Sequence, residues 1–245
     1  MLMCHKIKNG AIFIADAHDD SERDNFYRFL KAVETDKIKT PQLFIMGDMF
    51  DLLVGEVEHG VKKYQKYIDL IDKISLHVEI FYFEGNHDFA LAKLFKNVKV
   101  IPMQLQPLKY KLEDSTLAYL SHGDKYCGVV HAFYTMVIRS KMVLKLLNFI
   151  DRKVDGAVSK KIQSNQTKKD LCRKIENFEK IISEKLSNYQ AKKDSYIVEG
   201  HYHQNYSFSK NSINYINLPS FACNQSYFIV ECFKDNKFAL RSCNV

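Results

Sequence analysis

EIFYFEGNHDF, residues 79 to 89, joins an apolar run to a run of polar residues with almost no spacer between them. EIFYFEG (79–85) is expected to form a short strand with an apolar centre, and it ends in a glycine suited to a turn. Asn86, His87 and Asp88 come next. Because ligands usually bind in the loops that follow the strands of an α/β sheet, this stretch predicts a buried strand that carries a functional loop.

The first half of the chain shows this arrangement twice more. AIFIA (11–15) and LFIMG (43–47) are also expected strands, and each leads into acidic or imidazole side chains. Apolar residues at helical spacing separate these strands, at 26–33 and again at 61–71. Such alternation of strand and helix predicts a layered α/β (α+β) core. Further strands are expected at 98–101, 108–112 and 117–121.

The pattern changes in the second half. No proline occurs between Pro107 and Pro219, and residues 126–190 have a helical pattern. One apolar stripe, at steps of three or four, is formed by Leu171, Ile175, Phe178, Ile182 and Leu186. We therefore expect a single domain over residues 1–245 with a helical cap inserted at approximately 125–193. Strands are expected to resume at SYIVEG (195–200), INYINL (213–218) and SYFIVECF (226–233).

The composition is that of an ordinary globular protein, with 46% hydrophobic and 27% charged residues. The six cysteines are scattered and form no CxxC pair, which favours reduced thiols over a disulfide framework or a zinc site. The N-terminus lacks the layout of a signal peptide, and no window of about 18 uncharged apolar residues predicts a transmembrane helix. We expect a cytoplasmic protein.

Positive charge is concentrated in the expected cap. The chain has a formal charge of +7, and residues 139–193 hold 15 Lys or Arg against 6 Asp or Glu. A helix surface that faces water would account for this excess. The alternative is attraction to an anionic substrate or to an anionic membrane surface.

Five short motifs lie where expected strands end. They are Asp16-Ala17-His18, Gly47-Asp48-Met49-Phe50-Asp51, Gly85-Asn86-His87-Asp88, His122-Gly123-Asp124 and Gly200-His201-Tyr202-His203. Carboxylate, imidazole and amide groups together make a mixed nitrogen and oxygen site that suits Mn, Fe or Zn. Each motif alone is common, but all of them in this order, each beside a strand, are not. Residues two apart in a strand point to the same side, so Asp16 and His18 can project together.

The motif order DxH, GDxxD, GNHD, HGD and GHxH resembles the calcineurin-like metallophosphoesterases over residues 12–203. The resemblance implies a four-layer fold, a β-sandwich flanked by helices, with two divalent metal ions about 3.5–4 Å apart. It favours Mn²⁺, with Mg²⁺, Fe or Zn²⁺ as alternatives. The implied ligands are Asp16, His18, Asp48 and His203 for the first ion, and Asp48, Asn86, His122 and His201 for the second. Asp51 would support the metal-bearing loop.

The same resemblance implies hydrolysis without a covalent enzyme intermediate. Two cations lower the pKa of a shared water, and the hydroxide attacks phosphorus in line. His87 would protonate the leaving oxygen or stabilise its charge, with Asp88 orienting it. Asp124 would either orient an active-site histidine or brace its loop.

The expected cap is the better guide to the substrate. CGVVHAFYTMVI (127–138) has no formal charge when its histidine is neutral, and apolar residues continue to Ile150. These helices either pack against the core or form an apolar chamber for acyl chains beside the metals.

A cap between HGD and GHxH, together with GDMFD and GNHDF, is similar to the UDP-2,3-diacylglucosamine diphosphatases of lipid A biosynthesis. That group cleaves the pyrophosphate of its nucleotide-lipid substrate to 2,3-diacylglucosamine 1-phosphate (lipid X) and UMP. The resemblance implies substrate contacts from Asn86 and His87, and from Arg139 to a phosphate or the sugar unless it is a surface cation. Peripheral contact with the cytoplasmic face of the inner membrane is a further expectation. The best-known branch has Arg where this chain has His87, and a different cap sequence, so the similarity is to a divergent relative.

Other functions stay open on the sequence. A general phosphodiesterase or phosphatase acting on nucleotides or other phosphoesters fits His87 well. A non-catalytic scaffold would show eroded metal ligands, whereas every expected ligand is present. No basic groove with stacking aromatics is evident, so we expect neither a nucleic-acid partner nor an obligate protein partner.

Overall fold

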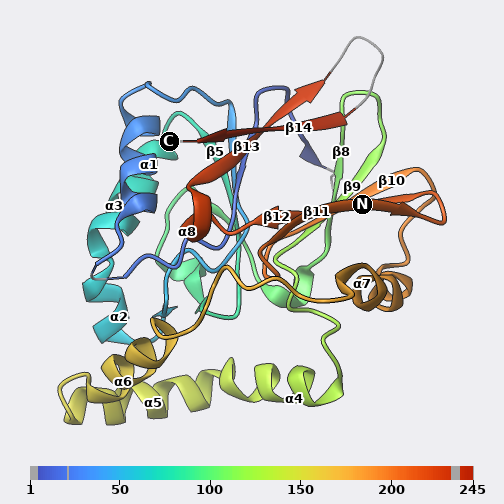
Figure 1. Ribbon diagram of the computed structural model, residues 1–245. Helices are drawn as coiled ribbons and strands as arrows, with labels where there is room; N and C mark the ends of the chain where they lie inside the picture. Colours follow the sequence, from blue (N-terminus) through green and yellow to red (C-terminus); the bar gives the residue numbers. More distant parts are fainter. Residues whose placement is uncertain (1–4, 21, 233–237, 245) are drawn as a thin grey trace.

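The structure is a computed structural model that describes residues 5–20, 22–232 and 238–244, and these form two six-stranded sheets packed face to face (Figure 1). The first sheet has the order β1 (His5–Lys6), β8 (Leu108–Lys111), β9 (Leu117–Ser121), β10 (Ser195–Glu199), β12 (Ile213–Pro219) and β11 (Gln204–Lys210). The second has the order β14 (Phe238–Asn244), β13 (Ser226–Cys232), β2 (Ile12–Ile14), β3 (Gln42–Ile45), β5 (Glu79–Phe83) and β7 (Lys99–Ile101). A small separate sheet pairs β4 (Leu53–Val54) with β6 (Asp88–Phe89).

Helices cover the outer faces of both sheets (Figure 1). α1 (Asn25–Glu34) and α3 (Gln65–Ile74) lie on the second sheet, and α7 (Phe178–Leu186) lies on the first. The other helices are α2 (Glu58–Lys63), α4 (Val129–Ile138), α5 (Lys141–Lys153), α6 (Ala157–Gln166) and α8 (Phe221–Asn224), with short 3₁₀ helices η1 (Leu91–Lys93), η2 (Met103–Leu105) and η3 (Ser187–Tyr189). The expected fold class, a mixed α/β sandwich flanked by helices, is confirmed.

The central strands of the second sheet are buried on both faces, and side-chain alternation places each residue in one layer. β2, β3 and β5 pair in parallel, which puts Phe13, Phe44 and Phe81 side by side. Their rings stack between the two sheets at centroid distances of 4.6 and 4.8 Å. Leu43 and Ile45 point the other way, toward α1 and α3. β2 is therefore continuously apolar, as are β3 and β5 after their first residue, because both faces of these strands pack on other layers.

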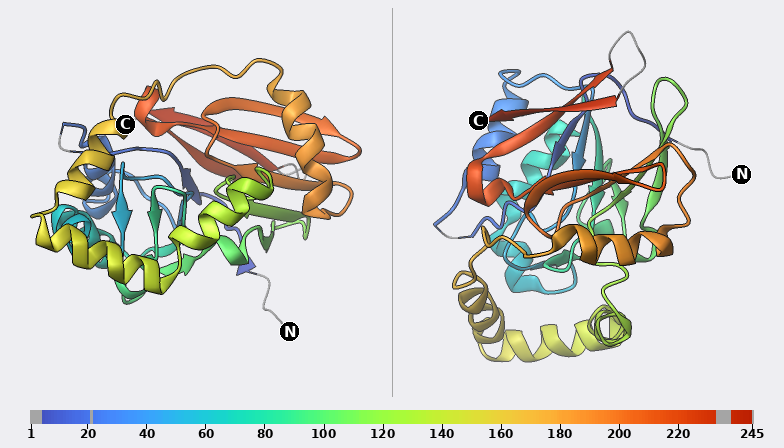
Figure 2. Two further views of the ribbon diagram at one scale, coloured as in Figure 1. Left: turned by 90° about the horizontal axis from the view of Figure 1, so that it is seen from below. Right: turned by 45° about the vertical axis from the view of Figure 1, so that its right-hand side comes forward.

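Residues 125–193 divide into two parts that lie in different places on the molecule (Figure 2). Helices α4, α5 and α6 make a helical arm that runs past α2, whereas α7 packs on the first sheet through Phe178, Ile182 and Leu186. None of the described helices combines the length and the apolarity that crossing a bilayer requires. Residues 1–4, on which the signal-peptide expectation partly rests, lie outside the described residues.

The expectation of one helical stripe starting at Leu171 was wrong. Residues 167–177 are turns and irregular backbone, and α7 begins only at Phe178. Contacts with Gln204 explain the difference, because its side-chain oxygen accepts a hydrogen bond from the Ile175 amide (2.9 Å). Its main-chain oxygen accepts another from Lys174 Nζ (3.0 Å). Backbone groups held by a distant strand are not available to a helix.

The expectation of reduced thiols was wrong for one pair of cysteines. Cys172 and Cys223 form a disulfide across a sequence separation of 51 residues. The disulfide ties the irregular segment 167–177 to the short helix α8. The spacing of the two cysteines along the sequence does not predict that they pair. Among the described side chains, Cys127 and Cys243 are free thiols. Cys4 and the side chain of Cys232 lie outside the described part.

Candidate metal centre

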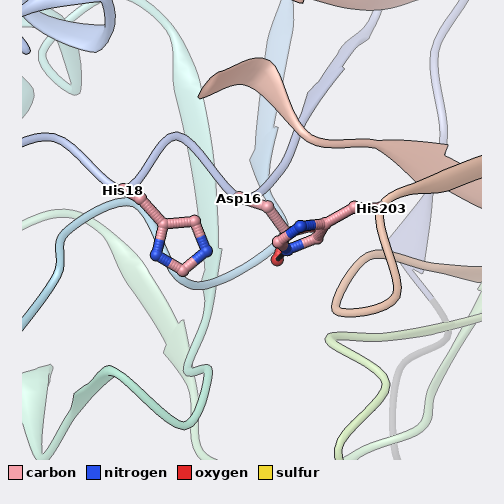
Figure 3. Close-up of side chains that lie close together, drawn as sticks. All are labelled: Asp16, His18 and His203. Atoms are coloured by element: carbon pink, nitrogen blue, oxygen red, sulfur yellow. Dashed lines mark ion pairs between the residues drawn. The ribbon is translucent and has the colours of Figure 1, made fainter. Parts of the chain in front are cut away.

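The side chains of the sequence motifs converge at one edge of the sandwich, in loops that follow β2, β3, β5, β9 and β10. Two clusters of potential ligand atoms form there, and within each cluster the atoms lie no more than 4.8 Å apart. The clusters are Asp16, His18 and His203, and Asp48, His122 and His201. Figure 3 shows the ring of His203 against the carboxylate of Asp16, with His18 beside them. Asn86 adjoins the second cluster, since its Oδ1 lies 3.3 Å from His122 Nε2.

The backbone is left-handed at most of these positions. The φ angles are +53° at Asp16, +46° at His18, +53° at Asp48, +64° at His201 and +60° at His203. This conformation costs a non-glycine residue about 1–2 kcal/mol, and it persists where the surrounding structure enforces it. Such residues cluster at functional sites, so the backbone is arranged to bring these side chains together at the expense of stability.

Two glycines allow the loops to approach one another. Gly47 has a φ of +90°, and a Cβ there would lie 2.5 Å from His122 Nδ1. A Cβ on Gly85 would collide with the carboxylate of Asp48. Any larger residue at either position would push a candidate ligand out of place.

Asp48 occupies the middle of the centre. Its Oδ1 accepts a hydrogen bond from the His87 amide (2.8 Å), while its Oδ2 lies 3.3 Å from His122 Nε2. Although burial alone would lower it, the charge of Asp48 raises the pKa of His122 well above its ordinary value. A cation beside His122 would take the place of that proton as the partner of the carboxylate.

Main-chain carbonyl groups orient two of the imidazoles. His122 Nδ1 lies 2.8 Å from the Met46 oxygen, and His203 Nδ1 lies 2.6 Å from the Leu171 oxygen. Each contact leaves Nε2 facing a carboxylate, and His203 Nε2 lies 3.2 Å from Asp16 Oδ1. Metal-binding histidines are usually held in this way, by a hydrogen bond from the ring nitrogen that does not bind the metal.

His18 fits a metal ligand for a further reason. It is 3% exposed, and within the described part of the chain neither of its ring nitrogens has a hydrogen-bond partner. Burial lowers the pKa of His18 and that of His201, which favours the neutral ring, the form that binds metals. Asp51 Oδ1 lies 3.6 Å from His18 Nδ1, next to the loop that this residue was expected to support. An orphaned, buried and neutral imidazole suits a divalent cation.

Asp88 does not orient His87, and this expectation was wrong. Its carboxylate accepts hydrogen bonds from the amides of Asp48 (2.9 Å) and Met49 (2.7 Å), and from the hydroxyl of Tyr82 (2.7 Å). Burial, with a further contribution from Asp48, raises the pKa of Asp88 to about 7. Asp88 therefore clamps the loop of Asp48 to its own loop. The His87 ring is oriented instead through Nδ1, 2.9 Å from the Asp51 main-chain oxygen.

Arg139 joins the arm to the base of the centre. Its guanidinium binds Glu84 Oε2 (3.2 Å) and the Gly85 carbonyl (2.6 Å), and lies 3.7 Å from Asp124 Oδ2. Asp124 is buried and accepts no hydrogen bond from the described residues, so both roles expected for it stay predictions. Sequence reasoning missed Glu84, although a charged residue at the end of an otherwise apolar strand was a visible signal.

Two cavities meet at the centre. One, of about 350 Å³, is lined by most of the candidate ligands together with Lys169 and Arg173; the ligands in its lining are His18, Asp48, Asn86, His201 and His203. The other, of about 390 Å³, lies under the arm and has a mainly apolar lining that includes Val54, Phe89, Ile138, Leu144 and Leu147. Asn86, His87, Gln166 and Lys169 line both cavities. A ligand could therefore place a polar group at the centre and an apolar group under the arm.

The chain is similar to several known proteins. It is 32% identical over 118 residues to a UDP-2,3-diacylglucosamine hydrolase from Tolumonas auensis, an alignment that covers 47% of each chain. The chain thus matches about half the length of that relative. It is 26% identical over 200 residues to a UDP-2,3-diacylglucosamine hydrolase from Haemophilus ducreyi, covering 78% of this chain and 83% of the other. Among solved structures, a dimetal phosphatase from Danio rerio aligns at 11% identity with a TM-score of 0.44, covering 96% and 95% of the two chains.

A family model described as calcineurin-like phosphoesterase matches residues 11–221. The match includes every loop that contributes to the two ligand clusters, from Asp16 to His203. It also spans most of both sheets and the whole arm. This chain belongs to the calcineurin-like phosphoesterase family.

Proposed function

We propose that the protein is a metal-dependent hydrolase that cleaves the pyrophosphate of UDP-2,3-diacylglucosamine to 2,3-diacylglucosamine 1-phosphate and UMP. The observation that carries this proposal is the apolar cavity under the arm, which adjoins the cavity at the ligand clusters. Asn86 and His87 line both cavities. A nucleotide-lipid presents a pyrophosphate next to acyl chains, and its site must pair a polar centre with an apolar cavity. The names of the relatives from T. auensis and H. ducreyi support the same substrate.

Two divalent ions would be held at the centre, and we propose Mn²⁺. Asp16, His18 and His203 would hold one, Asn86, His122 and His201 the other, and Asp48 would lie between them. Such ions supply an activated water and neutralise charge on phosphoryl oxygens when bound. In the overall reaction water adds across the P–O–P bond. One phosphorus keeps the oxygen of water, and the other phosphate leaves with the bridging oxygen and takes up a proton.

His87 is placed to act on the leaving phosphate. With Nδ1 donating to the Asp51 carbonyl, Nε2 lies 3.9 Å from Asp48 Oδ2 at the junction of the two cavities. A protonated ring would donate from Nε2 to the departing oxygen or stabilise its charge. Asp88 and Asp124 would contribute indirectly, by holding the loops that carry Asp48 and His122.

Contacts with the rest of the substrate would come from the arm and the segment after it. Lys169 lines both cavities and supplies positive charge where the second phosphate would lie. Arg139 also lines the apolar cavity, and its contact with a phosphate or with the sugar remains part of the proposal. Its guanidinium is already bound to Glu84 and Gly85, so this contact would use the remaining face of the group.

We further propose peripheral contact with the cytoplasmic face of the inner membrane. The arm exposes large apolar side chains, among them Val130 (85% exposed), Met142 (80%) and Phe133 (64%). Lys141 and Lys145 lie on the same arm. Exposed apolar groups combined with lysines suit an anionic lipid surface, where a lipid substrate would be met.

A general phosphodiesterase or phosphatase is the second candidate, favoured by histidine at position 87. One experiment separates the two. Purified protein with Mn²⁺ is given UDP-2,3-diacylglucosamine or bis(p-nitrophenyl) phosphate, and the products are identified by mass spectrometry. We expect release of UMP from the nucleotide-lipid. Turnover of the small diester with none of the nucleotide-lipid would establish the second candidate instead.

A further inference from the structure

Lys185 is a buried lysine that the proposed chemistry does not use. It lies on α7 and is 6% exposed. Its Nζ donates to both carboxylate oxygens of Glu199, at 3.0 and 3.1 Å. It also donates to the Gly123 carbonyl (2.6 Å) and to the Tyr202 hydroxyl (3.3 Å). An ammonium group can be buried only with such complete pairing.

The last two acceptors lie on the loops that carry the second ligand cluster. Gly123 follows His122, and Tyr202 follows His201. The rings of His122 and His201 are 5.1 Å apart, and a Cβ on Gly123 would lie 3.0 Å from the Cβ of His201. The Lys185 ammonium thus connects two loops whose separation sets the distance between these imidazoles.

Glu199 completes the connection from the sheet side. It ends β10, directly before the glycine and His201. Its carboxylate accepts hydrogen bonds from Ser121 Oγ (3.0 Å), Tyr215 OH (2.8 Å) and the Tyr189 hydroxyl. These three hydroxyl groups fix the position of the Glu199 carboxylate. The carboxylate in turn fixes the position of the Lys185 ammonium group.

We propose that Lys185 is a positioning residue that holds the His122 and His201 loops at the separation required by the second metal ion. The inference rests on the proposed two-ion centre. A buried ion pair is weak support for stability, since an apolar pair of similar volume often serves as well. The hydrogen bond from Lys185 to the Gly123 carbonyl differs from this ion pair, because an apolar side chain cannot donate to a carbonyl. Its loss should therefore affect metal binding more than folding.

The test compares Lys185→Met with the double variant Lys185→Met/Glu199→Gln. The single variant leaves a buried, uncompensated carboxylate and should lose stability. The double variant removes both charges. Its amide oxygen, in the place of Oε1, can still accept from Ser121 and Tyr189, and its amide nitrogen can donate to the Tyr215 oxygen, so its Tm should lie close to that of the wild type. Lys180→Met, an exposed lysine on the same helix, is the matched control.

Mn²⁺ binding is measured by calorimetry, and the spectrum of exchange-coupled Mn²⁺ pairs is followed by electron paramagnetic resonance. For the double variant we expect the second ion to bind about 10–100-fold more weakly, with the first unchanged and the coupled spectrum lost at limiting metal. Lys180→Met should match the wild type. Wild-type binding of both ions by the double variant, or equal weakening of both, would overturn the positioning role. Binding of a single ion by the wild type would instead refute the two-ion centre.

Discussion

The carboxylate of Asp48 faces different neighbours with its two oxygens, the His87 amide on one side and the His122 ring on the other. In Asp48→Ala, His122 loses the charge that raises its pKa, and the two ligand clusters lose the group between them. We expect bound metal to fall from two ions to one or fewer and turnover to fall at least about 100-fold. Elemental analysis of the purified variant and a rate assay measure both. Asp69→Ala, an exposed change on α3, is the control, and full metal content with normal turnover in Asp48→Ala would refute the bridging role.

His87 differs from the ligands because its Nδ1 is held by Asp51 while its Nε2 remains available. In His87→Gln, metal content should be retained, whereas kcat on the nucleotide-lipid should fall about 10²–10⁴-fold. An ester with a p-nitrophenolate leaving group needs little protonation, so its turnover should change much less. Steady-state rates on the two substrates test whether His87 donates a proton to the leaving group. Equal loss on both would argue against proton donation and for stabilisation of charge on the phosphoryl group.

At the scale of elements, the first residue of β5 links the neighbouring strands. Glu79 accepts hydrogen bonds from Lys99 on β7 (2.5 Å) and Gln42 on β3 (2.7 Å), and from Lys8 (3.3 Å). Although partial burial alone would raise it, these contacts lower the pKa of Glu79 to about 2. Since the folded-state pKa lies below the unfolded value, the stabilisation is present above about pH 4.5 and is lost as pH falls toward 2.

The corresponding experiment is thermal unfolding of Glu79→Gln and the wild type at pH 7 and pH 3. At pH 7 the variant should be less stable by at most about 1 kcal/mol, because the site is partly exposed and screened by water. At pH 3 the difference should shrink. Glu113→Gln, an exposed residue without a resolved partner in the described structure, should show no such trend. A constant difference between the two pH values would contradict the assigned cause.

The helical arm provides a second prediction at the scale of elements. Leu147 lines the apolar cavity, whereas its neighbour Leu146, on the same helix, is not part of the lining. Leu147→Arg should exclude several methylene groups of an acyl chain, and each is worth about 0.8 kcal/mol. We therefore expect kcat/KM for the nucleotide-lipid, in detergent micelles, to fall at least about tenfold, with the small diester unaffected. If Leu146→Arg causes the same loss, the acyl chain does not lie in this cavity.

At the scale of the molecule, the Cys172–Cys223 bridge closes a loop of 51 residues and ties the segment before α7 to the core. The double variant Cys172→Ala/Cys223→Ala should unfold at lower denaturant concentration, with a loss of about 2–4 kcal/mol. Chemical denaturation measures the change, and thiol labelling of the unfolded wild type with and without reductant counts the paired cysteines. Labelling that is independent of reductant would show that the bridge does not form in the protein as purified.

The whole fold also explains why the arm stays in place. Arg139 forms an ion pair with Glu84 and lies 3.7 Å from Asp124 Oδ2, so one arm residue places its charge beside buried carboxylates from two loops of the core. The Arg139 guanidinium also lies 4.8 Å from the ring centre of Phe89. The arm, the core and the metal centre are thus coupled through charges that are buried only when the molecule is assembled.

The sequence by itself determined the strands, the fold class and the residue types of the metal centre. A strand buried on both faces needs a continuous apolar run, and the expected strands at 11–15, 43–47 and 79–85 mark β2, β3 and β5 within two residues of their ends. Ligand chemistry restricts residue types in the same local way. Carboxylates and imidazoles at the ends of successive strands therefore mark the site in the sequence alone.

Only the tertiary structure decided which partners the buried polar groups have. Asp88 binds backbone amides some 40 residues away rather than the adjacent His87, and Lys185 binds Glu199 and a carbonyl on another loop. Cys172 meets Cys223, and residues 167–177 give up a helical pattern to contact Gln204. The physical reason is that a buried charge or amide is satisfied by whichever group the packed layers bring within hydrogen-bond distance. That proximity arises between distant segments and leaves no periodic trace in the sequence.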